Sequence, residues 1–378
     1  MPNLRVLHTL DSLNRGGAEM LTLDVCRNAR NANLDLTFVA TGGGDLEGEF
    51  RTSGAEFIGL QRRLPLDPIL VRELHRIIVD RRIQIVHAQQ AVEAMHLYLA
   101  TRGTGAYCVM SLQAYILDRK NRIATRLITP RMDRVCPVSQ SMQVWYRDGE
   151  GFEITDKYRV LPNGVDPARL QPSRLPGTAT LRMELGIDAS ATLLGMVGNF
   201  YPDQRKDQLT ICRALGRILG DRNDVHFVFV GAVHDGAQTY FDKCGRVCGE
   251  AGIADRVHFL GKRGDVVDIL TELDLFVFSS VQEGLPVAAI EALMLGVPMI
   301  VSDIPPLLEV TGLDGSGRPC AAVFKTGDAD DLAEKVTRLL QDQEELKRLG
   351  RLAKVEASKR FGIDSHLQTL RDIYRELI

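Results

Sequence analysis

The sequence predicts an α/β protein made of two Rossmann-like domains in tandem, and three observations lead to this prediction. The chain has 378 residues, which is too long for one compact core. Short apolar segments alternate with longer amphipathic ones, an order typical of parallel sheets flanked by helices. A Pro- and Gly-rich stretch, VLPNGVDPARLQPSRLPG (160–177), separates two such series and predicts an interdomain linker.

The first series lies within residues 1–168, which we expect to form the N-terminal domain. Its amphipathic segments include residues 68–82, where Leu70, Leu74, Ile77 and Ile78 recur at helical spacing. Its short apolar segments predict buried parallel strands at 4–10, 34–40, 55–60, 83–88, 106–112 and 133–138.

The second series lies within residues 169–360, the expected C-terminal domain. Its strands are expected at 193–199, 225–231, 256–261, 274–280, 298–302 and 321–324. The remaining residues, 361–378, carry an apolar stripe at helical spacing that a helix must bury, formed by Leu367, Leu370, Ile373 and Leu377.

Composition excludes several classes of protein. Hydrophobic residues make up 45% of the chain and charged residues 25%, as in globular proteins, and no segment approaches the roughly 18 unbroken apolar residues of a membrane span. The N-terminus lacks the pattern of a signal peptide, so we expect a cytoplasmic protein. A net charge of −3 gives no basic field for nucleic acid, and the seven cysteines lack a CxxC pair, which favours reduced thiols over a metal site.

One basic run stands out against this balance. The stretch DRKNRIATRLITPRMDR (118–134) includes Arg119, Lys120, Arg122 and Arg126. Two interpretations stay open: a solvated helix face, or a surface for an anionic lipid or an acidic acceptor. Under the second interpretation the protein is peripheral to the inner face of a membrane.

Two adjacent glycines follow the first predicted strand. Residues 4–10 run directly into DSLNRGGAEM, where Gly16 and Gly17 stand between Arg15 and Glu19. A strand that ends in a glycine pair before a helix indicates a backbone that approaches a bound phosphate or sugar closely. A glycine-rich connecting turn is the alternative.

The stretch SSVQEGLPVAAIEALMLGVP (279–298) is the most informative about the functional site. A strand ends here, EGLP makes a turn, and Pro286 suits the first position of a helix. Glu283 then lies in the turn and Glu291 two turns into the helix. Carboxylates can accept hydrogen bonds from sugar hydroxyls or a ribose diol, and amides at a helix N-terminus can bind phosphate oxygens.

Glu283 and Glu291 resemble the EX7E signature of the retaining GT-B fold glycosyltransferases, most closely family four. Across almost the whole chain, NGVD (163–166), FVFVG (227–231), VHFLG (257–261) and GGAE (16–19) are similar to further motifs of that family. The resemblance implies two parallel sheets that face each other across a cleft and a C-terminal helix (361–378) that crosses back to the N-terminal domain. It also implies a nucleotide diphosphate sugar as donor, with no tightly bound cofactor or metal.

The resemblance also implies roles for individual residues. Glu283 holds hydroxyls of the transferring sugar, and Glu291 holds the ribose. Further donor contacts are expected from backbone amides and close backbone approach at Gly284, Leu285, Gly16 and Gly17. Asn199 is a further expected donor-binding residue.

Two positions depart from the family pattern. In VGNFYPDQRKDQ (197–208), Lys206 matches the family's diphosphate-binding lysine, with one extra loop residue, but Asn199 stands where an arginine is usual. Arg205 is expected to supply the missing charge. In MSLQAY (110–115), Gln113 replaces a common histidine and can bind a hydroxyl without carrying a proton. His87 is a further candidate for contact with sugar or acceptor.

The predicted function is transfer of a hexosyl unit with retention of configuration, as in polysaccharide biosynthesis. A UDP-sugar is favoured over a GDP-sugar as donor, and the acceptor is a glycan, a lipid-linked or a small molecule. One alternative is a GT-B sugar-nucleotide epimerase. A second is an NAD-dependent oxidoreductase, although no G-x-G-x-x-G follows either domain's first strand. A third is a catalytically inactive binding protein, against which the retained Glu283, Glu291 and Lys206 argue.

Overall fold

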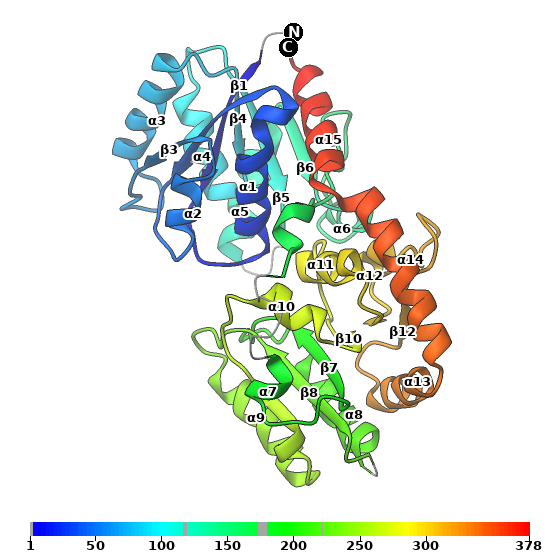
Figure 1. The fold of residues 1–378 in the computed structure, drawn as a ribbon. Coiled ribbons are helices and arrows are strands. Elements are labelled where there is room, and N and C mark those ends of the chain that lie inside the picture. The colour runs from blue at the N-terminus through cyan, green and yellow to red at the C-terminus, as the bar shows by residue number, and fades with distance from the viewer. Residues whose placement is uncertain (1–2, 116–118, 173–179, 221) are drawn as a thin grey trace. The chain divides into compact units, whose positions relative to one another are not determined.

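The computed structural model describes residues 3–115, 119–172, 180–220 and 222–378. Unit 1 comprises Met1–Asp166 and Phe361–Ile378, and unit 2 comprises Pro167–Arg360. Each unit is a parallel sheet flanked by helices (Figure 1). The predicted fold class of two Rossmann-like domains is therefore confirmed.

The sheet of unit 1 has six parallel strands in the order β3-β2-β1-β4-β5-β6. The register pairs β1 with β2 on one side and with β4 on the other, where His8 lies opposite His87. The strands are mostly apolar, as expected for a parallel sheet with helices on both faces. Their bounds are β1 Leu4–Leu10, β2 Leu34–Ala40, β3 Glu56–Gly59, β4 Ile85–Ala88, β5 Tyr107–Leu112 and β6 Arg134–Pro137.

Local sequence explains where the helices of unit 1 begin. The side chain of Asp67 accepts hydrogen bonds from the amides of Ile69 and Leu70, and Pro68 takes the first helical position. The helices are α1 Gly17–Asn28, α2 Glu47–Arg51, α3 Pro68–Asp80, α4 Ala91–Ala100, α5 Arg119–Ile128, α6 Gln140–Asp148 and α15 Ile363–Arg375.

The C-terminal helix α15 is part of the core of unit 1. It packs beside α1 (Figure 1), and its buried stripe joins the cluster formed by β1, β2 and α1. Gly164 of the NGVD motif lies directly against it, because a Cβ atom at this position would come within 2.6 Å of the His366 Cβ. The glycine of NGVD therefore permits close packing of α15.

A buried polar network links α15 to the sheet. The Tyr374 hydroxyl lies 2.8 Å from His8 Nε2 and 2.6 Å from His87 Nδ1, while His87 Nε2 lies 2.8 Å from Ser111 Oγ. His366, also buried, hydrogen-bonds the carbonyl of Pro162 through Nδ1 at 2.7 Å. Burial lowers the pKa of His8 to about 3, that of His366 to about 4, and that of His87 well below its usual range.

The sheet of unit 2 has the order β12-β11-β10-β7-β8-β9, again parallel. Aromatic side chains fill much of its core, and the rings of Phe229 and Phe259 stack with centroids 5.1 Å apart. The strands are β7 Thr192–Val197, β8 Val225–Val230, β9 Val257–Phe259, β10 Leu275–Phe278, β11 Met299–Ser302 and β12 Ala322–Phe324.

The helices of unit 2 also follow capping rules. Asp207 and Asp328 cap the N-termini of α8 and α13, and Gly296, in the left-handed region at φ 83°, ends α11. The helices are α7 Leu181–Glu184, α8 Gln208–Leu219, α9 Gln238–Glu250, α10 Val266–Thr271, α11 Val287–Leu295, α12 Pro305–Thr311, α13 Ala329–Gln341 and α14 Gln343–Phe361.

Strand order places one candidate site in each unit. In unit 2 the chain proceeds outward from β7 to β8 and β9, and then returns to β10 on the other side of β7. Unit 1 has the same reversal between β1 and β4. Ligands of open α/β sheets bind at the carboxyl ends of the strands where the order reverses. The loops after β7 and β10, and those after β1 and β4, are therefore candidate ligand sites.

Three further features concern the described residues alone. No described helix has the length and apolar character needed to cross a membrane. No group of three or more His, Cys, Asp or Glu side chains among these residues could hold a metal ion. All seven cysteines lie within the described ranges, where they are buried and form no disulfide.

We expect acid to destabilise unit 1 partly through His366. Its pKa is lowered on folding, so the unfolded chain binds an additional proton below pH 6.5 and this residue's contribution to stability falls with the pH. His366→Gln should destabilise unit 1 at pH 7, but its deficit relative to wild type should shrink by roughly 1.4 kcal/mol per pH unit between 6.5 and 5.

Urea unfolding followed by the fluorescence of Trp145 tests this expectation. Trp145 is the chain's single tryptophan and lies in α6, so it reports on unit 1. His75→Gln, which alters a half-buried ring, is the control. A deficit that stays constant from pH 7 to pH 5 would contradict the linkage.

Candidate functional site

The loops that follow β7 and β10 are joined by their backbones. The amide of Val281 donates to the carbonyl of Arg205 at 2.9 Å, and the amide of Asp207 donates to the carbonyl of Ser279 at 3.1 Å. Lys206 and Ser280 form an isolated antiparallel bridge between these contacts. The loops at the reversal of strand order in unit 2 are therefore held in a defined register.

Lys206 and Glu283 meet across this bridge. Their side chains form an ion pair in which Lys206 is 12% exposed and Glu283 is 10% exposed. Ser280 Oγ donates to Glu283 Oε1 at 2.7 Å, and Lys206 Nζ lies 4.3 Å from the centroid of the Phe278 ring. Two residues predicted from separate motifs, 77 positions apart, thus share one site.

The guanidinium of Arg205 pairs with a carboxylate of its own loop. Its guanidinium bonds both carboxylate oxygens of Asp203, with Nη2 2.6 Å from Oδ2, and lies 4.7 Å from the centroid of the Tyr201 ring. The side chain is about one third exposed. In this conformation Asp203 compensates the charge that was expected to replace the missing arginine.

Asn199 ties two loops together. Its Oδ1 accepts from the amide of Ala232 at 2.9 Å, and its Nδ2 lies 3.1 Å from Nε2 of His234. Both partners follow β8, so Asn199 links the loop after β7 to the loop after β8. This position therefore carries a neutral structural side chain beside Lys206.

The N-terminus of α11 completes the arrangement in unit 2. Gly284 and the buried Leu285 precede it, and the side chain of its N-cap residue, Pro286, makes no hydrogen bond to the first turn. The N-terminus of a helix presents amides and the positive end of the helix dipole to an anion. Glu291 lies in the second turn of this otherwise apolar helix.

Glu291 has a partner that the sequence analysis missed. Nη1 of Arg169 donates to Glu291 Oε1 at 2.6 Å, and the two side chains are 12% and 9% exposed. Arg169 belongs to the short 3₁₀ helix Pro167–Leu170 of unit 2. A buried, patterned carboxylate was a signal that a cation must lie nearby, but the sequence did not show which one.

In unit 1 the glycine pair begins α1. Gly16 is the N-cap residue with extended backbone, and a Cβ atom there would come within 2.6 Å of Glu19 Oε2. Gly17 is the exposed first residue of the helix. Burial raises the pKa of Glu19 to about 6. The absence of a side chain at Gly16 thus lets the Glu19 carboxylate fold back over the turn.

Gln113 follows β5, the neighbour of β4 in the sheet of unit 1, and His87 lies in the core. Gln113 Nε2 donates to Gln89 Oε1 at 2.8 Å, and both residues follow central strands. His87 is 1% exposed and both of its ring nitrogens are engaged, so it offers no surface to a sugar or acceptor. We therefore leave His87 out of the site.

Glu93 is a second residue that the sequence analysis missed. Its Oε1 accepts from the amide of Asp11 at 2.9 Å and its Oε2 from the amide of Gln89 at 3.0 Å. It thereby joins the loops that follow β1 and β4. Burial raises its pKa to about 8. The signal was a lone carboxylate within the apolar helix segment AVEAMHLYLA.

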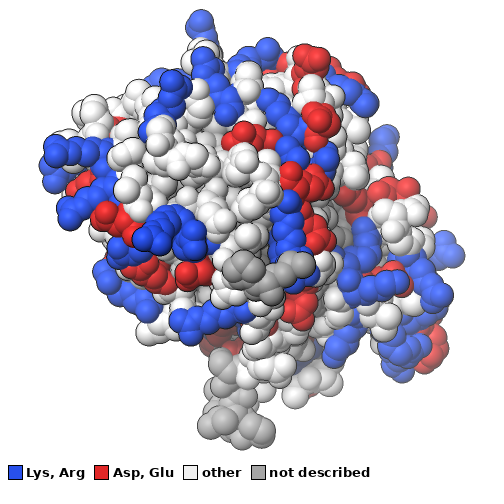
Figure 2. All heavy atoms as spheres, turned by 90° about the horizontal axis from the view of Figure 1, so that it is seen from above, with Lys and Arg blue, Asp and Glu red and all other residues white. Residues whose placement is uncertain are grey.

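Part of the basic run forms ion pairs within unit 1. Arg122 and Arg126 of α5 both form ion pairs with Glu150, whereas Arg119 and Lys120 are exposed. The predicted run begins at residue 118, which lies outside the described residues. Figure 2 shows Lys and Arg intermixed with Asp and Glu across the face that it draws.

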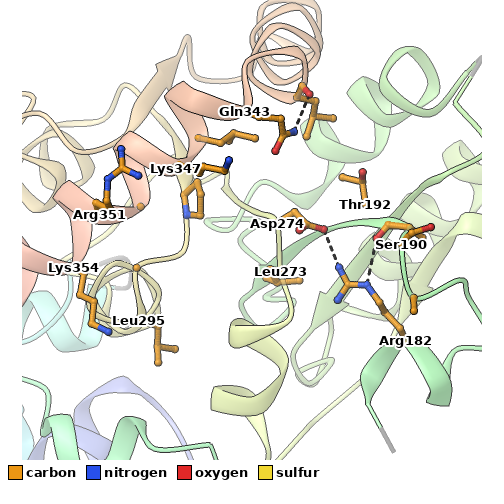
Figure 3. A pocket seen from close by; sticks show the side chains of 17 residues that line it. Arg182, Ser190, Thr192, Leu273, Asp274, Leu295, Gln343, Lys347, Arg351 and Lys354 are labelled. Atoms are coloured by element: carbon orange, nitrogen blue, oxygen red, sulfur yellow. Dashed lines mark hydrogen bonds and ion pairs between the residues drawn. The ribbon is translucent and has the colours of Figure 1, made fainter.

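A pocket of about 700 Å³ lies in unit 2 at the amino ends of the strands, opposite the carboxyl ends that carry Lys206 and Glu283 (Figure 3). Thr192 and Asp274, at the amino ends of β7 and β10, line it. Three exposed cations of α14 also line it, namely Lys347, Arg351 and Lys354. Its place at the amino ends of the strands separates it from the loops that carry Lys206 and Glu283.

Comparisons with known proteins agree with this geometry. The family model described as Glycosyltransferase Family 4 matches residues 15–169, and that described as Glycosyl transferases group 1 matches residues 178–356. An Escherichia coli relative, named UDP-Gal:alpha-D-GlcNAc-diphosphoundecaprenol alpha-1,3-galactosyltransferase, is 23% identical in an alignment that covers 96% of this chain and 94% of the relative.

Two other comparisons extend this finding. The lipopolysaccharide core biosynthesis mannosyltransferase LpsB of Rhizobium meliloti (strain 1021) is 23% identical over 58% of this chain and 61% of its own length. The crystal structure of Anabaena HepE in complex with UDP and glucose has a TM-score of 0.84 and 18% identity, and covers 99% of this chain and 100% of HepE. The GT-B fold implied by the sequence motifs is therefore confirmed.

We expect Lys206→Ala to lower donor turnover roughly 100-fold or more, as for the loss of a group that stabilises charge in a transition state. Arg205→Ala should cost less, on the order of tenfold, because Asp203 already compensates its charge. Steady-state kinetics of both variants, beside their thermal unfolding midpoints, test this. Equal losses would mean that Arg205 leaves Asp203 to contact the donor.

Proposed function

This chain belongs to the group 1 (family 4) glycosyltransferases, and from that premise we propose that it moves a hexosyl unit from a UDP-sugar to a lipid-linked acceptor with retention of configuration. Donor recognition is assigned to unit 2 and acceptor recognition to unit 1. The domain limits follow the same assignment, with the donor domain near residues 169–360 and helix α15 counted with the acceptor domain.

The observation that carries this proposal is the meeting of Lys206 with Glu283 where strand order reverses. The Lys206 ammonium and the Glu283 carboxylate, both nearly buried, can bind different parts of one nucleotide sugar. Lys206 takes the diphosphate, and Glu283 accepts hydrogen bonds from hydroxyls of the transferring sugar. The amides of Gly284 and Leu285 and the N-terminus of α11 add further contacts to phosphate and sugar.

Glu291 supplies the remaining donor contact. It lies in the second turn of α11, and we propose that it accepts hydrogen bonds from a ribose diol. Asn199 gives no charge to the diphosphate, so Lys206 carries most of the electrostatic task. Arg205 contributes only if the donor draws it away from Asp203.

The proposed chemistry needs no general base on the protein. The bond from the anomeric carbon to the diphosphate oxygen breaks, and a bond to the acceptor oxygen forms on the same face of the sugar. The departing diphosphate oxygen takes the acceptor proton. Lys206 stabilises the negative charge that develops on that oxygen, which is the transition-state interaction that accelerates the step. A glutamine at position 113 is compatible with this scheme because no side chain must carry a proton.

The names of two similar proteins support the choice of donor and acceptor. The Escherichia coli relative is named for UDP-Gal and for an acceptor on diphosphoundecaprenol, and the Anabaena structure contains UDP and glucose. We therefore place UDP before GDP and a lipid-linked acceptor before a free glycan or small molecule. Gly16 and Gly17 after β1 and Gln113 after β5 are the proposed contacts of unit 1. Exposed Arg119 and Lys120 are proposed to face an anionic membrane surface.

A nucleotide panel tests the proposal. A ligand that binds only the folded state raises the unfolding midpoint by mass action, so UDP should raise it more than GDP or ADP, and NAD should leave it unchanged. Release of UDP from UDP-sugars should require an added lipid-linked acceptor. Stabilisation by NAD alone would favour an oxidoreductase, and acceptor-independent conversion of the UDP-sugar would favour an epimerase.

The two glutamates should differ in their kinetic effects. Glu291→Gln should mainly raise the donor KM and weaken bare UDP by roughly 1.5–3 kcal/mol, because ribose contacts exist equally in the ground and transition states. Glu283→Gln should mainly lower kcat and leave UDP affinity nearly unchanged, because its contacts strengthen as the glycosidic bond stretches. Calorimetric titration of UDP beside steady-state kinetics tests the division. An equal loss of UDP affinity in both variants would refute it.

A further inference from the structure

The pair formed by Arg169 and Glu291 joins two segments that are far apart in the sequence. Nη1 of Arg169 lies 2.6 Å from Oε1 of Glu291, and 122 positions separate the two residues. Both side chains are nearly buried, at 12% and 9% exposure. The pair belongs wholly to unit 2, where the 3₁₀ helix Pro167–Leu170 contacts α11.

The surroundings of Glu291 make this partner necessary. Its side chain is 9% exposed, and Val287, one turn earlier on the same face of α11, is buried and apolar. A carboxylate in such a place has lost much of its hydration, and an ion pair with further hydrogen bonds compensates that loss. A guanidinium is suited to this task because it is planar and permanently charged.

The geometry also leaves part of the carboxylate open. Arg169 bonds Oε1, and within the described residues no hydrogen bond to Oε2 is found beside it. A carboxylate that binds a diol must present its oxygens in one fixed orientation. A guanidinium that holds one oxygen restricts the side-chain rotamers and therefore the direction of the other oxygen.

From these observations we infer that Arg169 is a positioning residue, which orients Glu291 for the ribose hydroxyls of the donor. The inference rests on the proposed function of Glu291. It assigns a donor-binding task to the segment that directly follows the NGVD motif, and it predicts that Arg169 acts on the nucleotide only through Glu291.

The test compares ribose and deoxyribose nucleotides. Calorimetry should give at least a tenfold preference of the wild type for UDP over 2′-deoxy-UDP. Arg169→Met should reduce that preference to less than threefold, with the donor KM raised and kcat largely kept. Arg182→Met is the matched control, since Arg182 is 15% exposed and paired with Asp274 in the same unit, and it should retain the full preference. An Arg169→Met variant that keeps the tenfold preference would overturn the inference.

Two further variants separate positioning from simple loss of stability. Because Arg169 acts through Glu291, Arg169→Met should have little further effect on UDP affinity in a Glu291→Gln background. Arg169→Lys keeps the charge without the planar fork, and should lie between wild type and Arg169→Met if the methionine variant folds poorly. Additive losses in the double variant would refute the inference.

The same titrations distinguish failure of the inference from failure of the proposed function. If wild type binds UDP and 2′-deoxy-UDP equally, the ribose role of Glu291 is wrong, and the role of Arg169 fails with it. If wild type binds neither UDP nor GDP, the proposed donor class itself is wrong. A normal preference in wild type that Glu291→Gln abolishes and Arg169→Met preserves refutes Arg169 alone.

Discussion

The ion pair between Lys206 and Glu283 links two loops that the strand order of unit 2 directs to opposite sides of the sheet. The chain leaves β7 toward one side of the sheet and leaves β10 toward the other, so their loops diverge from neighbouring strand ends. Backbone hydrogen bonds and the buried pair hold these loops together. In the proposed function, the donor replaces this pair, because its diphosphate offers the lysine a new anion and its sugar offers the carboxylate new donors.

Unit 1 joins its diverging loops through a different side chain. At its reversal of strand order, the carboxyl group of Glu93 accepts amide hydrogen bonds from both diverging loops. Gln89 and Gln113 add a neutral bond beside it. Unit 2 thus joins its two loops with an ion pair, and unit 1 joins its loops with backbone amides bound to one carboxyl group. The amides of Gln89 and Gln113 are suited to hydrogen bonds with hydroxyls.

Local patterns in the sequence predicted most of the fold. Apolar segments located all twelve strands within about two residues, and the spacing from Glu283 to Glu291 indicated a turn followed by a helix. These features depend on neighbouring residues alone. The family resemblance added the expectation that Lys206 shares a site with Glu283, and the structure places the two in contact.

Contacts between distant segments could not be predicted in this way. Nothing near Arg169 or Glu291 in the sequence identifies one as the partner of the other, because only the fold brings them within 2.6 Å. Asn199 shows the same limit, since its bond to Ala232 joins residues 33 positions apart. His87 was a candidate for contact with sugar or acceptor, but the docking of α15 encloses it in the core.

A crystal structure of the protein with UDP bound tests the central claim most directly. The account predicts a diphosphate within hydrogen-bond distance of Lys206 Nζ, a ribose at Glu291 Oε2, and a broken contact between Lys206 and Glu283. A diphosphate held instead by Lys347, Arg351 and Lys354 in the pocket at the amino ends of the strands would contradict it.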